Sequence, residues 1–591
     1  MAALFTTPKR NDKTSGAHFV EPDVRRRTLL AHGSWRRVTR RIVCGLACAL
    51  TVSSLLMPSV SLAAEWVNVG GAQYNYGTAA GDAAGTWSWD GADDMKLNGY
   101  NGGAIEAEGK LNVTYSGNNT VTNDNGRGIL VMDGNTENAE LNIQGDASST
   151  LNVTSSGDAI MSEGDINIDG AGTVNATSTE HDAIDAKGNL TIKGSGNVNA
   201  TGDSDGIRAD DNITIDNSGT VTAKATEDQG IDAHENLTIK GGGKVEASSA
   251  EDVAIWASSN IEIAGGSQVK ANSEEDSAVE AKGGLAVTNA SLNANGAGYG
   301  VYTYKGITLD GATVTVRASA GSGEASALFT DEDDIFIKNG SIVDAFAEGQ
   351  FSTAISTRNH NPNGAGGHIY ISDSVVKAIA RYVESDSDGP DHYSNDQSGG
   401  AIPEPRGVNI GIFARTEEGI TPATISIVRS KVTAEGDTAA IFALATSADG
   451  EAIGTIEIEG APIQTPAGGK IIDYYRYEEE YGRGISYEVG QTIGTGDAVI
   501  DSPYDAAVAK STVIVPPVEI KPEEKPGETK PEGSKSEGTK TTKTIAVAAT
   551  GAKTTGKLAA TGDTSGAAIV ATVLAGTAAI AAGAVVSRKR S

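Results

Sequence analysis

A short sequence unit repeats with small changes between Gly157 and Val316. Successive copies read DAIMSEGDINIDGAGTVNATSTE, DAIDAKGNLTIKGSGNVNATGDS, DGIRADDNITIDNSGTVTAKATED and QGIDAHENLTIKGGGKVEASSAED. The first large aliphatic residue of each copy, here called the lead aliphatic, recurs every 22 to 24 residues, at Ile160, Ile184, Ile207, Ile231, Ile255, Val279 and Val301. A fixed period of this length is typical of solenoid folds, in which each repeat packs against its neighbours.

Within each repeat, apolar residues alternate with polar ones. A pair such as Leu190-x-Ile192 begins six residues after the lead aliphatic, and a third short run follows at positions such as Val198. Alternation interrupted by Gly, Asn, Asp and Ser predicts short β-strands. Three such strands leave no room for a helix in the repeat. We therefore predict an all-β fold, a right-handed parallel β-helix with three short strands per coil, over residues 103–514.

Composition agrees with a solenoid and excludes some partners. The chain has 74 glycines among 591 residues and only 5% aromatic residues, which suits many tight turns around a thin core. Both cysteines, Cys44 and Cys48, lie within residues 1–63, so disulfides and thiol chemistry are not expected elsewhere. Because residues 1–63 hold ten basic and three acidic residues, the overall net charge of −31 becomes −38 for the remainder. Such a surface repels nucleic acid and attracts cations.

The N-terminal segment has the features of a secretory signal. Residues 1–63 contain seven arginines between Arg25 and Arg41, an apolar run from Ile42 to Leu56, and a small-x-small cleavage pattern ending at Ala63. An uncleaved membrane anchor is the alternative. Residues 64–102 are predicted to form an N-terminal cap, in which Trp66, Trp87 and Trp89 cover the open edge of the first coil. A sugar-stacking platform is the alternative for these three rings.

The C-terminal region changes composition abruptly. Residues 515–545 are rich in Pro, Lys, Glu, Gly and Thr and have almost no apolar residues, which predicts a disordered, extended linker over residues 515–557. The sequence LAATG follows, then the apolar stretch 567–586 and a short basic tail. The five residues of this motif are Leu558, Ala559, Ala560, Thr561 and Gly562. A stretch of this length predicts a helix that can span a bilayer, and the basic tail favours the cytoplasmic side.

This order of motif, span and basic tail resembles the cell-wall sorting signal of Gram-positive bacteria, in its LAxTG form. The resemblance implies that a membrane sortase cuts between Thr561 and Gly562 and joins Thr561 to peptidoglycan. The membrane would then be a partner only before sorting. It also implies that the mature protein is displayed on the extracellular surface, with residues 515–557 crossing the wall.

Acidic residues recur in the turn that precedes each lead aliphatic. Stacked coils place equivalent positions about 4.8 Å apart, so repeated acids form columns of carboxylates that repel one another. A divalent cation removes that repulsion, and calcium prefers six to eight oxygen ligands. We predict a calcium site among five acids: Asp158, Glu180, Asp182, Asp203 and Asp205. A solvated acidic edge that resists aggregation is the alternative. A second candidate is the loop sequence from Glu384 to Asp391, ESDSDGPD, which an unstructured polar insertion explains equally well.

The residue after each lead aliphatic is expected to point outward. We predict that five of these residues bind a glycan: Asp185, Arg208, Asp232, Trp256 and Tyr302. The residue before the lead aliphatic is small, which predicts a flat, open groove: Ala183, Gly206, Gly230, Ala254, Ala278 and Gly300. Ordinary variety on a solvated face is the alternative. Arg208 could serve as the base of a polysaccharide lyase, although a salt bridge between coils explains it better.

The recurring phrase D-A-I-x-A-x-G-x-L-T-I, as in Asp182 to Gly194, resembles the bacterial surface carbohydrate-binding domain family of parallel β-helices. That family is similar in fold to pectate lyases and is taken to bind acidic plant polysaccharides with calcium, without cleaving them. The resemblance implies acidic site positions at Asp158, Asp182, Asp205 and Asp232. The opening Asp is lost at three positions, which would confine a metal column to the N-terminal half of the array: Gln229, Val253 and Ser277.

The leading hypothesis is therefore a wall-anchored, non-catalytic protein that binds polysaccharide with calcium. The second is a surface adhesin or spacer that binds host protein or mucus. The third is a calcium-dependent polysaccharide lyase.

Overall fold

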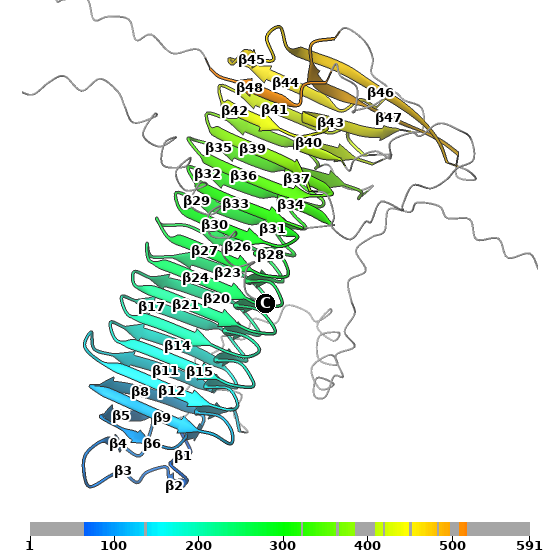
Figure 1. Ribbon diagram of the computed structural model, residues 1–591. Coiled ribbons are helices and arrows are strands. Elements are labelled where there is room, and N and C mark those ends of the chain that lie inside the picture. The colour runs from blue at the N-terminus through cyan, green and yellow to red at the C-terminus, as the bar shows by residue number, and fades with distance from the viewer. Residues whose placement is uncertain are drawn as a thin grey trace, which may run out of the picture. The chain divides into compact units, whose positions relative to one another are not determined.

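Every regular element in the described part of the chain is a β-strand (Figure 1). The computed structural model describes residues 64–134, 139–320, 323–361, 366–383, 408–417, 420–447, 452–480, 484–496 and 508–516. Among these residues, no helix has the length and apolar character needed to cross a membrane. The predicted signal peptide, the loop at 384–391, nearly all of the linker and the sorting signal with its span at 567–586 lie outside the described residues.

Most strands form three long sheets, in which each strand pairs in parallel with the equivalent strand of the next coil (Figure 1). The lead sheet carries the lead aliphatics. Its parallel strands are β7 (Ile105–Glu108), β10 (Ile129–Met132), β13 (Ile160–Ser162), β16 (Ile184–Ala186), β19 (Ile207–Ala209), β22 (Ile231–Ala233), β25 (Ile255–Ala257), β28 (Val279–Ala281), β31 (Tyr299–Thr303), β34 (Glu324–Thr330), β37 (Phe351–Asn359), β40 (Asn409–Thr416) and β43 (Ala439–Ser447).

The second strands of the coils form the middle sheet. Its parallel strands are β5 (Asp94–Asn98), β8 (Lys110–Ser116), β11 (Glu140–Gly145), β14 (Asp165–Gly170), β17 (Leu190–Gly194), β20 (Ile213–Asn217), β23 (Leu237–Lys240), β26 (Ile261–Ile263), β29 (Leu285–Thr288), β32 (Ile307–Asp310), β35 (Ile335–Lys338), β38 (Ile369–Ser372), β41 (Thr424–Val428) and β44 (Thr455–Glu459).

The third strands form the third sheet. Its parallel strands are β6 (Asn101–Gly102), β9 (Asn118–Asn123), β12 (Thr150–Ser155), β15 (Thr173–Ser178), β18 (Asn197–Thr201), β21 (Thr220–Ala225), β24 (Lys244–Ser249), β27 (Gln268–Ser273), β30 (Ser291–Gly296), β33 (Thr313–Ser319), β36 (Ile342–Gly349), β39 (Val375–Tyr382) and β42 (Lys431–Glu435).

The register confirms the predicted stacking of repeats. Ile184 pairs with Ile160 on one side and with Ile207 on the other, and the remaining lead aliphatics continue this column through Val301. The second strands also pair like with like, as Leu190 does with Ile213. The predicted class, an all-β parallel β-helix with three strands in each coil, is therefore confirmed. Since successive coils share no covalent contact except the chain itself, this pairing and the buried columns hold the array together.

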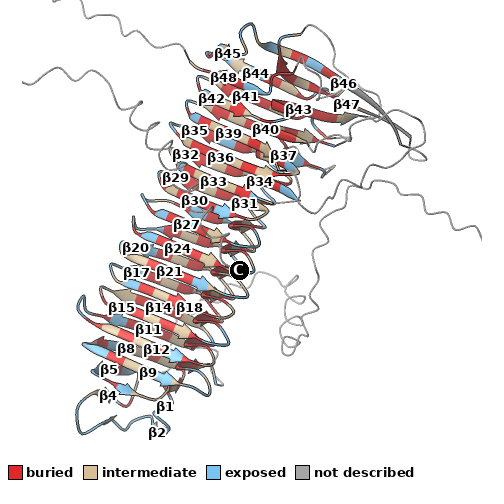
Figure 2. Cartoon of the chain, in the orientation of Figure 1, coloured by how far each residue is buried: buried red, intermediate tan, exposed pale blue. Residues whose placement is uncertain are grey.

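The core is one continuous cluster that runs along the inside of the three sheets. Figure 2 shows buried and more exposed residues alternating along the strands. The lead aliphatics are fully buried, as are their second-strand counterparts such as Leu237. Alternation is regular along strands of the middle and third sheets such as β14 and β15, whereas three strands of the lead sheet are buried along their whole length: β13, β16 and β22.

Antiparallel strands cover the N-terminal end of the array. β1 (Trp66–Val69) pairs antiparallel with β2 (Ala72–Asn75) and with β7, and β3 (Ala80–Gly81) and β4 (Trp87–Trp89) lead antiparallel into β5. Trp87 and Trp89 are buried against the first coils, so these two rings present no open face for a sugar. The first parallel pairings, β5 with β8 and β6 with β9, begin before Gly103.

Antiparallel strands also cover the C-terminal end. β47 (Gly484–Gly494) pairs antiparallel with both β43 and β46 (Lys470–Glu480), and β48 (Ser511–Ile514) pairs antiparallel with β42 and β45 (Ile463–Thr465). Within the described residues, parallel stacking therefore ends with β42, β43 and β44 rather than continuing to residue 514. Covered ends of this kind remove the unpaired strand edges through which solenoids aggregate.

Candidate functional site

One file of residues runs along the outside of the lead sheet, one from each coil. We call it the outer row. From β13 to β34 its members pair in register as Met161, Asp185, Arg208, Asp232, Trp256, Glu280, Tyr302 and Phe329. The five residues predicted to bind a glycan all belong to this row. Successive members of the row lie about 4.8 Å apart. Charged residues occupy the part of the row from Asp185 to Asp232, and aromatic residues occupy its C-terminal end.

Three aspartates meet at the charged end of the row. The carboxylate oxygens of Asp158, Asp182 and Asp185 all lie within 4.8 Å of one another, and all three side chains are buried. We call this group the acidic cluster. Asp158 and Asp182 come from turns that precede the lead strands, and Asp185 comes from the outer row. The structure therefore brings together two residues predicted to bind calcium and one predicted to contact a glycan.

Asp185 corrects the expectation that every residue of the outer row faces solvent. Only 2% of this residue is exposed. It faces Asp182, which lies three residues earlier in the chain, because the turn before β16 brings the two carboxylates to the same side. The sequence D-A-I-D at 182–185 could have suggested this meeting, because it places two aspartates three residues apart where the turn enters the strand. The preceding coil has Met161 in place of the second aspartate.

Glu180 and Asp203 do not join the acidic cluster. Glu180 is exposed and Asp203 is partly exposed. Each lies two residues before a buried aspartate of the turn, Glu180 before Asp182 and Asp203 before Asp205. Glu180 and Asp203, which were predicted to bind calcium, therefore contribute no buried carboxylate to the described site.

Three basic side chains lie near the carboxylates of the cluster. Arg127 Nε lies 2.8 Å from Asp158 Oδ2, and Lys187 Nζ lies 2.7 Å from Asp185 Oδ2. Arg208 is more distant, with Nη1 3.9 Å from Asp182 Oδ2. Asp182 thus has the weakest direct compensation of the three carboxylates.

The buried aspartates of the turns also form a ladder with the backbone. Asp182 Oδ1 accepts a hydrogen bond from the Asp205 N–H at 3.0 Å, and Asp205 Oδ1 accepts one from the Gln229 N–H at 2.8 Å. These bonds fix the turns of successive coils over one another. The column of aspartates ends at Gln229, which donates its backbone N–H to Asp205 but has no carboxylate to accept a bond from the next coil.

Burial and mutual repulsion shift the protonation of two of these groups. Burial, with smaller contributions from Asp185 and Asp158, raises the pKa of Asp182 to about 6. Burial together with the charges of Asp182 and Asp232 raises the pKa of Asp205 to about 9. The cost of holding these carboxylates ionised is therefore large without an added cation.

Arg208 lies among acids from three coils. Its Nη2 is 3.3 Å from Asp210 Oδ1 and its Nε is 3.6 Å from Asp232 Oδ2, in addition to the contact with Asp182. Burial lowers the pKa of Arg208, but the charges of the surrounding aspartates outweigh it and the net pKa is raised. A guanidinium held in its protonated form cannot accept a proton from a substrate, so this geometry agrees with a salt bridge between coils and not with a lyase base.

Aromatic rings occupy the other end of the row. Tyr302 stacks on Phe329 with ring centroids 5.5 Å apart, and Tyr299 and Tyr304 pack against it at 5.1 and 5.3 Å. Tyr304 is 37% exposed. The sequence prediction missed Tyr299, Tyr304 and Phe329, although the spacing of YGVYTY signals that two tyrosines share one face.

Trp256 lies between the charged and aromatic parts. The Lys282 ammonium lies 5.2 Å from the indole centroid, and the His234 ring meets it edge-on at 5.8 Å. His234 Nε2 is also 3.0 Å from Asp232 Oδ2, a hydrogen bond that raises the pKa of His234. The indole is therefore held in place by its neighbours while remaining partly exposed.

The small residues before the lead aliphatics do not open a groove, contrary to the prediction. They point inward and are buried against the backbone of neighbouring strands. A Cβ atom at Gly206 would lie 2.6 Å from both Gly230 O and Lys224 N, and one at Gly300 would lie 2.1 Å from a methyl of Val316. Small residues are needed here because the turn packs closely on the third sheet.

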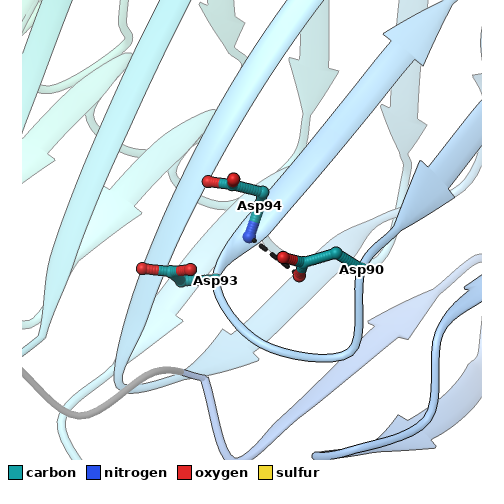
Figure 3. A group of neighbouring side chains, drawn as sticks. All are labelled: Asp90, Asp93 and Asp94. Carbon is teal, nitrogen blue, oxygen red and sulfur yellow. Dashed lines mark hydrogen bonds between the residues drawn. The ribbon is translucent and has the colours of Figure 1, made fainter.

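A second acidic group, not singled out from the sequence, lies in the loop between β4 and β5 and at the first residue of β5. Figure 3 shows Asp90, Asp93 and Asp94 with their carboxylates close together. Asp90 Oδ1 accepts hydrogen bonds from the N–H groups of Ala92 and Asp94, at 2.8 and 3.2 Å. Asp90 and Asp94 are exposed, and these hydrogen bonds stabilise the turn that closes the loop. The turn therefore accounts for the short distances between the carboxylates.

A polar groove crosses the middle sheet. Its volume is about 600 Å³, and its lining includes a stack of asparagines: Asn189, Asn212, Asn236 and Asn260. Each Nδ2 after the first donates to the Oδ1 of the asparagine in the preceding coil, at 3.0 to 3.2 Å. The stack therefore uses its amide groups to hold the turns in register, which the repeated GNL, DNI and ENL sequences could have suggested.

Comparison with known proteins gives a family match for part of the chain. Residues 100–246 match the model of a family described as carbohydrate-binding domain-containing protein. The matched segment contains the acidic cluster and Arg208 but not Trp256 or Tyr302. No curated protein and no solved structure matches the chain.

Proposed function

We propose that the solenoid binds polysaccharide along the outer row, with calcium held by the acidic cluster, and that it does so without catalysis. The observation that carries this proposal is the meeting of three buried carboxylates, those of Asp158, Asp182 and Asp185, at one end of a row that continues into partly exposed aromatic rings at Trp256 and Tyr302. The family match over residues 100–246 supports carbohydrate as the partner.

The charge balance favours a bound cation. Five buried carboxylates lie in this region: Asp158, Asp182, Asp185, Asp205 and Asp232. Four basic side chains contact them, so that one carboxylate is in excess: Arg127, Lys187, Arg208 and His234. An all-oxygen donor set with excess negative charge fits calcium, which tolerates an irregular shell of carboxylates and water. Calcium would supply a positive charge that both the cluster and an acidic sugar can share.

The rest of the row suits a long glycan. Arg208 offers a guanidinium for carboxylate or hydroxyl groups, Trp256 and Tyr302 offer partly exposed ring surface, and the exposed ring of Tyr304 lies beside the row. Aromatic surface with a few placed polar groups is the usual composition of a ligand site. Because the coils repeat at about 4.8 Å, a polymer lying along the axis could contact several members of the row.

Calorimetric titration tests the choice of ligand. With calcium present, polygalacturonate is expected to bind the full-length chain and to release measurable heat, because its carboxylates can complete the calcium shell. A neutral galactomannan is expected to bind the outer row at least tenfold more weakly, since it lacks those carboxylates. Equal affinity for both polymers, with Trp256→Ala weakening both alike, would contradict an acidic glycan as the ligand of the outer row.

We also propose that the protein is exported and attached to the cell wall of a Gram-positive bacterium. The support is the order of segments in the sequence: residues 1–63, the linker 515–557, and the LAATG motif with its apolar stretch and basic tail. A peptidoglycan hydrolase is expected to release the wild-type protein from cells, and Thr561→Ala to move it to the detergent-soluble fraction. Release of both forms by detergent alone would contradict wall attachment.

A further inference from the structure

We infer that a second carbohydrate site, for a neutral sugar, lies on the middle sheet around Phe336. The ring of Phe336 is 38% exposed on the outer face of β35. It borders a cavity of about 380 Å³ lined by Gly306, Thr308, Asp333, Asp334 and Phe336. This site lies on another sheet than the outer row, outside the segment matched by the family model, and does not depend on the proposed function.

One face of the ring is covered and the other is open. Phe336 pairs in register with Tyr370 of the next coil and with Thr308 of the preceding one. Its ring stacks on that of Tyr370, with centroids 5.0 Å apart and planes inclined by 10°. On the opposite side Thr308 has only a short side chain and Gly306 has none. The aromatic face that borders the cavity is therefore flat and held in position.

The supporting residues fix this geometry. The His368 ring packs against Tyr370 at 5.9 Å, and His368 Nδ1 accepts a hydrogen bond from the Thr424 N–H at 3.1 Å. Asp334 Oδ1 accepts one from the His368 N–H at 3.0 Å. A preorganised ring loses little side-chain entropy when a ligand stacks on it.

The chemistry of the cavity selects a neutral sugar. A pyranose has an apolar face of C–H groups that can lie on Phe336, and hydroxyl groups at its rim. The carboxylates of Asp333 and Asp334 line the same cavity and can accept hydrogen bonds from those hydroxyls. They would repel an acidic sugar, because no basic side chain lines the cavity as described. The nearby cation, Lys305, already pairs with Glu332.

Affinity electrophoresis tests this inference on the full-length chain, in native gels that contain galactomannan, xylan or laminarin. At least one of these neutral polymers is expected to retard the wild-type chain, in EDTA as well as in calcium. Phe336→Ala is expected to weaken that retardation about tenfold, and Phe336→Trp to preserve it. Phe351→Ala is the matched control, because Phe351 is also an exposed phenylalanine but lies on the lead sheet.

The outcomes separate this site from the outer row. Loss of neutral binding in Phe336→Ala with unchanged binding of polygalacturonate supports the inference. Failure of all three neutral polymers to retard the wild-type chain would overturn it and leave the outer row unaffected. Equal effects of Phe336→Ala and Phe351→Ala, or binding of a cation in place of a sugar, would also overturn it.

Discussion

Without calcium, the chain is expected to unfold at a lower temperature at pH 8 than at pH 5. The folded-state pKa values of Asp182 and Asp205 are raised to about 6 and about 9, against an ordinary value near 3.8. Between those values the folded state binds more protons than the unfolded state, so stability falls as pH rises. The contribution is complete near pH 4 and is lost progressively as pH passes the two folded-state values.

Calcium is expected to reverse this loss. Ionised carboxylates bind the ion, so calcium should raise the unfolding temperature more at pH 8 than at pH 5. Differential scanning calorimetry in EDTA and in calcium measures both effects, and we expect a difference between pH 5 and pH 8 on the order of 5 °C in EDTA. Stability that rises from pH 5 to pH 8 in EDTA would contradict the account.

Asp205→Asn provides a matched control for the pH effect. Asparagine can still accept the hydrogen bond from Gln229 N–H but carries no charge. The variant should therefore reduce the dependence on pH to the part that Asp182 contributes, while keeping the response to calcium, because Asp205 lies outside the acidic cluster. A variant that retains the full pH dependence would show that other groups cause it.

Replacement of the two partly exposed aromatic residues of the outer row, Trp256 and Tyr302, is expected to weaken polysaccharide binding strongly. Trp256→Ala and Tyr302→Ala should each reduce affinity for polygalacturonate about tenfold, and the double variant about a hundredfold. The effects should be close to additive, because Trp256 and Tyr302 lie two coils apart, about 10 Å. Calorimetric titration in calcium gives both values.

A matched control comes from the N-terminal end. Tyr76 is 63% exposed and lies just after β2, away from the outer row. Tyr76→Ala should leave the affinity unchanged. A loss as large as that of Tyr302→Ala would place the glycan elsewhere, and an unchanged double variant would remove the aromatic end of the row from the site.

The sequence predicted the columns of this fold well, because a strand has a side-chain period of two and each coil repeats the same pattern. The pairing of Ile184 with Ile160 and Ile207 follows from that period alone. The burial of Asp158, Asp182 and Asp205 was not evident from the letters, since a polar turn residue usually faces solvent. What buries them is the close stacking of one turn on the next, which a single repeat cannot reveal.

Side chains that meet because a turn bends were harder to predict. Strand alternation alone would place Asp185 in solvent. In the structure it faces an aspartate of the preceding turn instead. Gly206 has no side chain and was therefore predicted to leave an open groove, yet the backbone of the third sheet packs against it. The stacked pair of Phe336 and Tyr370 is 34 residues apart, because the coil between them is longer than the repeat, and a fixed period does not align them.

The proposed calcium site is tested most directly by titration of polygalacturonate in calcium and in EDTA, with wild type beside Asp182→Asn and Asp169→Asn. Asp182 belongs to the buried acidic cluster, whereas Asp169 is a partly exposed aspartate on the middle sheet. We expect tight binding by the wild type and by Asp169→Asn in calcium only, and weak binding by Asp182→Asn in both buffers. Equal affinity in calcium and in EDTA, or equal affinity of all three proteins, would contradict a metal ion in the acidic cluster as part of the glycan site.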